Sequence, residues 1–346
     1  MRFDVPSATF RVNVDTTAFH RGTLITVIPR KSPRSTTPDG PTRSERYPMP
    51  QTAVADSDTG IPLRELARRH GLTAAGRLPS LPAYTRLLWS YRHFITSYAN
   101  AKVTSSLGKT RLGMVWQVLT PLINAAVYFV IFGVLLGTSQ DIKNFVPYLC
   151  TGVFLFQFTQ SVVQAGIQSI SGNLGLIRAL HFPRASLPLA ITTVEVRNML
   201  ASMTVLMLIV LGSGEPLTLD WLLVVPIFLL QAIFNAGLAM AVARLGSKVA
   251  DFKQLVPFIM RIWLYGSAVL YPVTMFEQKL DGWLLAVVEA NPLLVFIDLM
   301  RHALMEDVPL AASPMVLWLE AVAWTLVVGL SGFVYFWRGE KGYGRG

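Results

Sequence analysis

The chain has 346 residues, of which 52% are hydrophobic and 14% are charged, and its mean hydropathy is +0.47. Soluble domains carry roughly 25% charged residues, so this composition excludes a single soluble core and predicts an integral membrane protein. The single cysteine, Cys150, excludes a disulfide framework, and the net charge of +10 is unevenly distributed along the chain.

Residues 1–60 are predicted to be a mostly disordered N-terminal extension. The stretch 28–60 is rich in Pro, Ser, Thr and Arg, a composition that buries too little apolar surface to offset the entropy of ordering. These residues contain no continuous apolar segment of the kind that a secretory signal needs. We therefore expect the N-terminus to stay in the cytoplasm.

Residues 61–112 form a basic segment that we expect on the cytoplasmic side of the membrane. Between Ile61 and Arg111 there are nine Lys or Arg residues against one acid, Glu65. Aromatic and aliphatic residues recur at helical spacing over 84–101, which predicts an amphipathic helix lying on the membrane surface. Its aromatic rings would lie at the headgroup level and its cations near anionic lipid; the alternative is a soluble helix packed on another domain. The residues that define this interfacial helix are Tyr84, Leu88, Tyr91, Arg92 and Tyr98.

The segment 113–338 is predicted to be a transmembrane domain of six helices, followed by a cytoplasmic tail over 339–346. Each of its long apolar runs approaches the roughly 20 residues that a helix needs to cross the hydrocarbon core. The runs are 114–137, 146–170, 187–211, 219–243, 255–275 and 314–337. The predicted fold class is therefore an all-α membrane protein.

The distribution of Lys and Arg predicts that both termini are cytoplasmic. With the N-terminus inside, the inner loops and the tail contain eight cations, whereas the outer loops contain only Lys143, Lys279 and Arg301.

The connection 276–313 contains two apolar pieces, 283–288 and 293–300, separated by Asn291 and Pro292. Each piece is too short to span, so we expect two re-entrant helices buried against the bundle, where their backbone groups are satisfied. The alternative is an external loop with a small apolar cap.

Motifs for bond chemistry are absent from the sequence. Gly108, Lys109 and Thr110 resemble the end of a phosphate-binding loop, but the glycine required five residues earlier is replaced by Val103. The five histidines are scattered, so no metal site is expected, and no catalytic residue is predicted. Energy for any uphill transport must come from another chain or from an ion gradient.

Charged residues within the predicted spans are few: Glu195, Arg197, Arg261 and Glu320. Such residues mark functional sites or structural pairs. Aromatic residues are common in the spans and suit a channel for a polysaccharide, because aromatic faces stack on sugars, although lipid-facing positions are their commoner use. The candidates for lining a channel or gate are Trp116, Tyr128, Phe132, Phe156, Arg261, Tyr265, Asn291, Pro292 and Phe296.

Four motifs occur in the order found in one family of membrane proteins. NLGLIRALHFPRASLP begins at Asn173, LGKTRLGMVWQVLTPL enters the first span, VPYLCTGVFLFQF opens the second, and ANPLLVFIDLMRHAL precedes the last. Over about residues 84–338 the chain resembles the permease subunits of polysaccharide ABC exporters, which move O-antigen, teichoic acid and related lipid-linked glycans. Ala185 replaces the acid that is usual after Phe-Pro-Arg, which puts one expected contact with the ATPase in doubt.

The resemblance implies a half-transporter. Two copies of the chain would form a channel, and two copies of a separate nucleotide-binding subunit would bind ATP and Mg below them, so no cofactor is expected in this chain. The loop from Arg178 to Leu187 would be a coupling helix bounded by Pro183 and Pro188, the interfacial helix would rest on the same ATPase, and the re-entrant pair 283–304 would be the external gate. The implied coupling residues are Arg178, His181, Phe182, Pro183 and Arg184.

The sequence therefore predicts the transmembrane subunit of an ABC exporter that carries a lipid-linked polysaccharide outward across a bacterial plasma membrane. Its expected partners are membrane lipid, the glycan, a second copy and the ATPase, with no nucleic acid. An ABC exporter of a drug or another small hydrophobic molecule is the first alternative. An ion-driven secondary transporter would show two inverted halves, which the sequence lacks, and a membrane-embedded glycan-processing enzyme would need more intramembrane acids.

Overall fold

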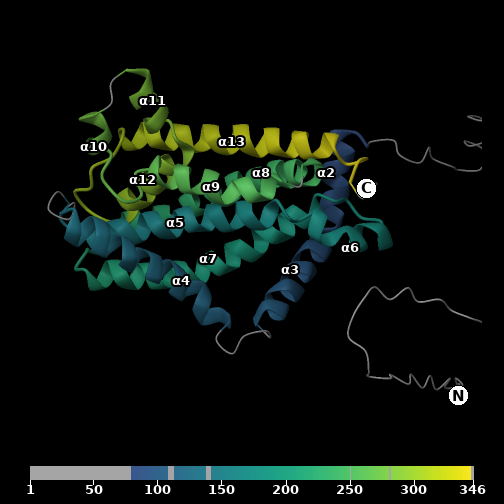
Figure 1. Ribbon diagram of the computed structural model, residues 1–346, viewed down its shortest axis with the longest axis horizontal. Helices are drawn as coiled ribbons and strands as arrows, with labels where there is room; N and C mark the ends of the chain where they lie inside the picture. Colours follow the sequence, from purple (N-terminus) through teal and green to yellow (C-terminus); the bar gives the residue numbers. More distant parts are fainter. Residues whose placement is uncertain (1–78, 108–112, 138–141, 250, 280–281, 344–346) are drawn as a thin grey trace, which may run out of the picture. The chain divides into compact units, whose positions relative to one another are not determined.

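The computed structural model describes residues 79–107, 113–137, 142–249, 251–279 and 282–343, and these are almost entirely helical (Figure 1). The predicted extension 1–60, the basic residues up to Arg77, and Lys109 and Arg111 lie outside the described residues. Within the described part no strand occurs, so the all-α prediction is confirmed.

Five stretches of the described chain are long and apolar enough to cross a membrane. Continuous apolar runs become helices in lipid because only internal hydrogen bonds satisfy the backbone there. They are α4 (Gly113–Tyr128) with its π-helical continuation η2 (Phe129–Leu135), α5 (Phe145–Gly166), α7 (Ser186–Gly212), η5 (Leu219–Leu223) with α8 (Val224–Lys248), and α13 (Pro314–Arg338).

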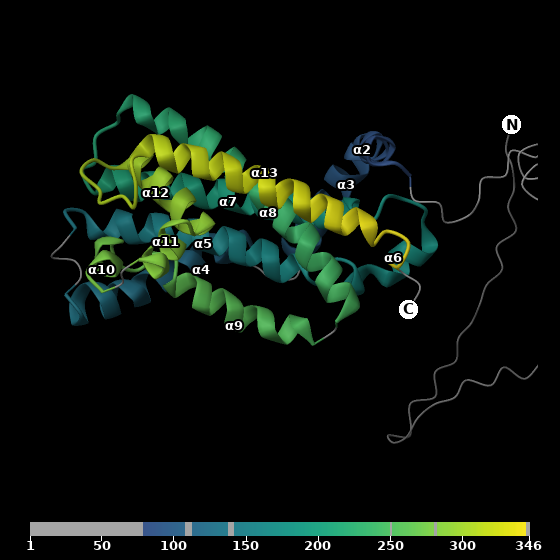
Figure 2. The ribbon, with the colours of Figure 1, turned by 90° about the horizontal axis from the view of Figure 1, so that it is seen from above.

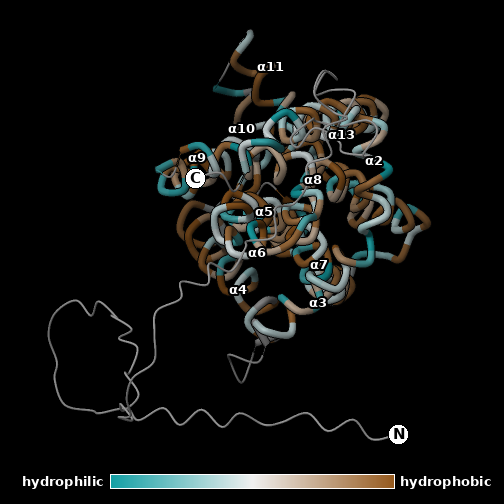
Figure 3. Tube along the Cα trace, turned by 90° about the vertical axis from the view of Figure 1, so that its right-hand side faces the viewer, coloured by the Kyte–Doolittle hydropathy of each residue, from teal (hydrophilic) through white to brown (hydrophobic). Residues whose placement is uncertain are grey.

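Helix α5 is the centre of the bundle. Figure 3 looks along the helices and shows α5 surrounded by α4, α7, α8, α9 and α13, with hydrophobic residues along much of these helices. In the most apolar part of α5, 78% of the residues are buried, against 17% for α4 with η2 and 22% for α13. The peripheral helices therefore present their apolar side chains outward, as expected in lipid.

The predicted span 255–275 is not one continuous helix. Helix α9 (Phe252–Tyr265) has 14 residues, which at about 1.5 Å per residue reach only some two thirds of a hydrocarbon core of roughly 30 Å. Beyond it the chain leaves the helix, and Ala268 has a positive φ of 47°. This differs from the prediction because side chains from a distant segment hold the non-helical backbone, as described below.

The predicted re-entrant pieces are two short helices, α11 (Trp283–Glu289) and α12 (Pro292–Leu304), which meet at 58° across the break at Asn291. Their burial differs sharply, since α11 has no buried residue, whereas most of α12 is buried among α5, α8 and α13. Arg301, assigned to an outer loop from the sequence, is fully buried in α12. Without Arg301, the outer loops contain only two cations, Lys143 and Lys279, so the excess of cations on the inner side is larger.

The remaining helices lie at the ends of the bundle. Figure 1 shows α2 (Leu81–Ser90), α6 (Leu174–Ala179) and the C-terminal end of α13 at one end, which we call the α6 end. Helix α3 (Arg92–Leu107) packs along α7, and the four-residue helix α10 (Thr274–Glu277) lies with α11 at the opposite end (Figure 2).

Helices α8 and α13 touch backbone to backbone at Gly237 and Gly332. A methyl group on Gly332 would overlap the carbonyl of Gly237, with the Cα of Gly237 only 3.1 Å away. A methyl group on Gly237 would lie 2.6 Å from the Cα of Gly329. Glycine at these positions allows close approach, the usual basis of tight packing between membrane helices.

Gly332→Ala is therefore expected to lower the unfolding temperature of the detergent-purified protein by roughly 5 °C, since overpacking of this kind destabilises by about 1–3 kcal/mol. Gly329→Ala is the matched control, because the nearest atom to its added methyl, Cγ2 of Ile233, is 3.8 Å away. Equal unfolding temperatures for the two variants would contradict the contact.

Candidate functional site

Asn291 joins the C-terminal end of α9 to the start of α12. Its amide nitrogen donates to the carbonyl of Gly266 at 2.8 Å and to the hydroxyl of Ser267 at 3.0 Å. Its amide oxygen accepts from the indole N–H of Trp263 at 2.8 Å and from the N–H of Leu293 at 3.1 Å. One side chain thus caps both helices, and Pro292 occupies the first turn of α12, where its missing N–H leaves no donor unpaired.

Arg301 satisfies the backbone just beyond this point. Its guanidinium donates to the carbonyl of Ala268 at 3.1 Å and to that of Val269 at 3.2 Å. It also lies 3.4 Å from the centre of the Tyr148 ring and 3.2 Å from a carboxylate oxygen of Asp298. The arginine therefore fixes the non-helical segment after α9 against α5 and α12.

Asp298 and Gly152 complete the surroundings of this arginine. The second carboxylate oxygen of Asp298 accepts from the N–H of Ala311 at 3.0 Å, so the buried pair is hydrogen-bonded as well as charged. Gly152 leaves room for the guanidinium, because a methyl group there would lie 2.9 Å from Nη2 of Arg301. Arg301 was predicted only as a loop cation, and no local pattern in the sequence indicates carbonyl partners 33 residues earlier.

The gate candidate Phe296 lies deep in the bundle. It is fully buried in α12 and packs against Phe234 of α8, with ring centroids 5.4 Å apart. Phe156, also proposed to line a channel, is 3% exposed within α5. Packing inside the bundle accounts for both rings.

The other channel candidates lie closer to the surface of the described bundle. Arg261 and Tyr265 are exposed on α9, while Tyr128 and Phe132 are half-buried at the junction of α4 and η2. The ring of Phe132 lies 6.2 Å from that of Tyr271. Their role as channel residues stays a prediction.

At the α6 end, Glu340 connects three segments that are far apart in sequence. Its carboxylate accepts from the N–H of Arg184 at 2.9 Å and from the hydroxyl of Tyr84 at 2.8 Å. The guanidinium of Arg184 lies 3.6 Å from the carboxylate and donates to the backbone carbonyl of Glu340 at 2.8 Å. The chain after α13, the start of α7 and helix α2 are thereby tied together.

Ala185 lies within the same cluster. It is fully buried, and its N–H donates to the hydroxyl of Tyr84 at 3.3 Å. A carboxylate does lie beside this position, but it belongs to Glu340. Because it meets the N-terminus of α7, its negative charge interacts favourably with the helix dipole.

The tyrosines of the predicted interfacial helix face protein. The hydroxyl of Tyr91, at the break between α2 and α3, donates to the carbonyl of His181 at 3.3 Å, and that of Tyr98 donates to the side chain of Asn173 at 2.6 Å. Tyr84 is 1% exposed. The face that these tyrosines share therefore packs on the loop 173–185, and the placement of the helix on the membrane surface stays a prediction.

Further contacts complete this packing. The ring of Phe94 lies 5.0 Å from that of Phe182, Pro183 is buried, and Leu88 packs against the cluster around Tyr84. Arg92 is exposed, 5.7 Å from the ring of Trp89.

The short helix expected between Arg178 and Leu187 lies earlier in the chain than the sequence indicated. The short helix is α6, Leu174–Ala179, whereas Pro188 lies in the first turn of α7 and bounds no separate helix. The last turn of α6 and the loop that follows it present Arg178, Leu180 and His181 outward, and the Leu180 side chain is 50% exposed.

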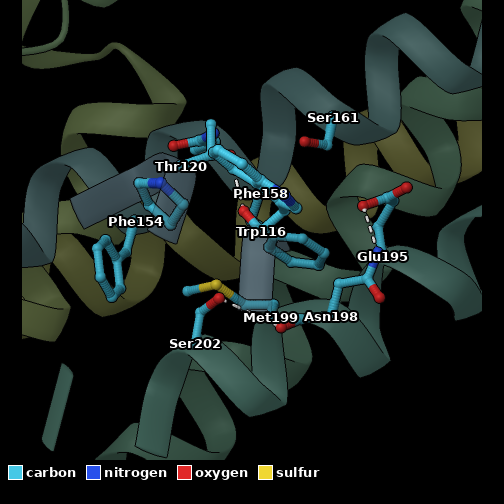
Figure 4. Close-up of a pocket in the computed structure, with 11 residues that line it drawn as sticks. Trp116, Thr120, Phe154, Phe158, Ser161, Glu195, Asn198, Met199 and Ser202 are labelled. Atoms are coloured by element: carbon cyan, nitrogen blue, oxygen red, sulfur yellow. Dashed lines mark hydrogen bonds between the residues drawn. The ribbon is translucent and has the colours of Figure 1, made fainter. Parts of the chain in front are cut away.

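A cavity of about 350 Å³ opens between α4, α5 and α7 (Figure 4). It combines aromatic rings with hydrogen-bonding side chains, a mixture that suits a ligand with both apolar faces and hydroxyl groups. The carboxylate of Glu195 accepts from the amide of Asn198 at 3.1 Å at one wall. The lining residues are Trp116, Thr120, Pro121, Phe154, Gln157, Phe158, Ser161, Glu195, Asn198, Met199 and Ser202.

Only Trp116 of this cavity was among the channel candidates. The polar residues were readable from their spacing, because Gln157 and Ser161 are four residues apart on α5, and Glu195, Asn198 and Ser202 share a face of α7. The described residues contain no group of acids, histidines and cysteines that would hold a metal.

Removal of the Glu340 carboxylate is expected to destabilise the α6 end. Glu340→Ala should lower the free energy of unfolding by about 1–3 kcal/mol, because a partly buried N–H and a buried hydroxyl lose their acceptor. Glu340→Gln is the matched control, since its amide oxygen still accepts and its nitrogen faces the oxygen of Tyr84. Thermal unfolding in detergent measures both, and equal losses would contradict the role of these hydrogen bonds.

The same contact should depend on pH. Burial raises the pKa of Glu340, against the opposing effect of the hydrogen bonds from Arg184 and Tyr84. A raised pKa gives a stability contribution that is fully present below the pKa of an unfolded glutamate and is lost as pH rises through the raised value. The unfolding temperature of the wild type relative to Glu340→Gln should therefore increase as the pH is lowered through this window.

These features define a polytopic membrane protein whose bundle contains an interrupted helix, a bent pair of short helices of which the second is buried, and a loop held against the helices at one end. The sequence profile of ABC-2 type transporters matches residues 98–305, and the chain belongs to this family of transport subunits. The resemblance inferred from the four motifs is thereby confirmed.

Similar proteins carry names from polysaccharide export. The chain is 27% identical over 223 residues to an O-antigen export system permease protein of Klebsiella pneumoniae, covering 64% of this chain and 83% of the relative. It is 23% identical over 194 residues to an O-antigen export system permease protein of Myxococcus xanthus, covering 56% and 74% respectively. A polysialic acid transport protein of Escherichia coli is 23% identical over 205 residues, covering 59% and 78%.

Proposed function

We propose that this chain is the transmembrane subunit of an ABC exporter that moves a lipid-linked polysaccharide outward across a bacterial plasma membrane. Two copies form the channel, both termini are cytoplasmic, and two copies of a separate ATPase bind ATP and Mg and drive transport. The observation that carries the proposal is the exposed loop after α6, which is fixed from behind by Tyr84, Tyr91 and Glu340.

The loop suits a docking surface for an ATPase because it combines rigidity with exposed chemistry. Phe182 packs on Phe94, and Arg184 is bound by Glu340, so neither side chain projects freely. Leu180 presents an apolar side chain beside two basic or titratable residues, Arg178 and His181. A partner pushing on this surface would move α7 and α13 together, since Arg184 connects them.

The cargo is inferred from the cavity between α4, α5 and α7 and from the names of the similar proteins. Rings such as Trp116 stack on apolar faces of sugars, while Gln157 and Asn198 bind hydroxyl groups. A transported drug would need mainly apolar walls, so the side-chain amides and hydroxyls favour a glycan.

Charge reversal at Arg178 tests the docking surface. Leu180→Asp should abolish co-purification of the ATPase with the tagged protein while leaving its unfolding temperature unchanged, and Arg178→Glu should abolish co-purification as well. Lys341→Glu is the matched control, because Lys341 is an exposed cation at the same end. Arg184→Glu is unsuitable as a probe, since it would also break the contact with Glu340. Full retention of the ATPase by both loop variants would refute the assignment.

Depletion of the chain in its bacterium tests the cargo. We expect lipid-linked glycan to accumulate in the cytoplasm and to disappear from the cell surface. Normal surface glycan on depletion would instead favour export of a small hydrophobic molecule. Continued export after loss of the ATPase would favour an ion-driven transporter.

A further inference from the structure

A second groove, of about 400 Å³, lies between the α2–α3 segment and the helices α7 and α8. Its walls are mainly aliphatic, with Leu88 and Ile95 on one side and Leu189, Val196 and Ala236 on the other. It uses a different face of α7 from the polar cavity, which is lined by Glu195, Asn198, Met199 and Ser202.

The polar atoms in the wall of this groove are already satisfied. The hydroxyl of Thr192 donates to the carbonyl of Pro188 at 3.0 Å, and that of Thr193 donates to the carbonyl of Leu189 at 2.9 Å. The protons of both hydroxyl groups are therefore already used within α7. The groove therefore suits a hydrocarbon chain and offers little to a sugar.

The mouth of the groove is cationic. Arg92 lines it beside Trp89, with the guanidinium 5.7 Å from the indole ring and 3.3 Å from the backbone carbonyl of Trp89. Residues 81–107 contain Arg86, Arg92 and Lys102 and no acid. An exposed tryptophan with an arginine is typical of the membrane interface, where anionic headgroups lie.

The depth of the groove matches part of one leaflet. Leu189 and Val196 are seven residues apart on α7, a rise of roughly 10 Å. The hydrocarbon of one leaflet is about half of a core of roughly 30 Å. A chain entering beside Arg92 would therefore run well into the leaflet along α7.

We propose that this groove binds an anionic phospholipid of the leaflet at the α6 end of the bundle. Its phosphate lies on Arg92, and one acyl chain lies between α3, α7 and α8. The bound lipid fills the space between the α2–α3 segment and the bundle. It is a resident lipid rather than the cargo, because the walls on α7 and α8 are aliphatic and their threonine hydroxyls already donate to their own helix. The site follows from the membrane location of the chain and is independent of the proposed export activity.

Lipid retention tests the site without an ATPase or a cargo. The purified protein is reconstituted in nanodiscs of phosphatidylcholine with a minority of phosphatidylglycerol and then released into detergent, and its bound lipids are counted by native mass spectrometry. We expect the wild type to retain phosphatidylglycerol in preference to phosphatidylcholine. Arg92→Ala should weaken this retention about tenfold, as expected for loss of one hydrogen bond to a charged group.

Two further variants separate headgroup from chain. Arg86→Ala removes an exposed cation of the same segment that does not line the groove, and it should retain the lipid as the wild type does. Ala236→Phe fills the groove and should abolish retention although Arg92 is present. Wild-type retention by Ala236→Phe, equal loss in the two arginine variants, or retention of phosphatidylcholine as strong as that of phosphatidylglycerol would each overturn the proposal.

Discussion

Backbone hydrogen bonding inside the bundle is the constraint on which the arrangement of the second half of the chain depends. After α9 the carbonyls of Gly266, Ala268 and Val269 lack helical partners, and lipid offers none. Asn291, which caps α12, and Arg301 within α12 supply the donors. The end of α9 and the burial of α12 are therefore coupled. The carbonyls after α9 need the donors of Asn291 and Arg301, and the guanidinium of Arg301 needs these carbonyls as acceptors.

A comparable dependence holds at the α6 end, with a carboxylate in the central position. Glu340 follows the last long helix, yet it binds the residue that precedes α7 and a tyrosine of α2. The loop between α5 and α7 consequently has a fixed backing, although its outer side chains are exposed. A surface that transmits rigid-body motion needs this combination of a fixed backbone and exposed side chains.

Hydropathy was sufficient to predict most of the fold, since a continuous apolar run in lipid has few alternatives to a helix. It failed at 255–275 because composition does not reveal that Arg301, a distant residue, would stabilise a non-helical turn. The helical spacing of Tyr84, Tyr91 and Tyr98 was correctly recognised, but an apolar face does not specify whether lipid or protein covers it. Glu340 was beyond prediction, whereas the spacing of Glu195, Asn198 and Ser202 on one face was readable.

The contact between Gly237 and Gly332 has a mechanical consequence for any change of conformation. Because the two backbones touch, α8 and α13 cannot slide or rotate past each other without first separating. The two helices should therefore move together as one rigid unit, against which the buried α12 and the central α5 pack. If the bundle widens, the more exposed helices α4 and α9 would hinge away, while α5, α8, α12 and α13 stay in place.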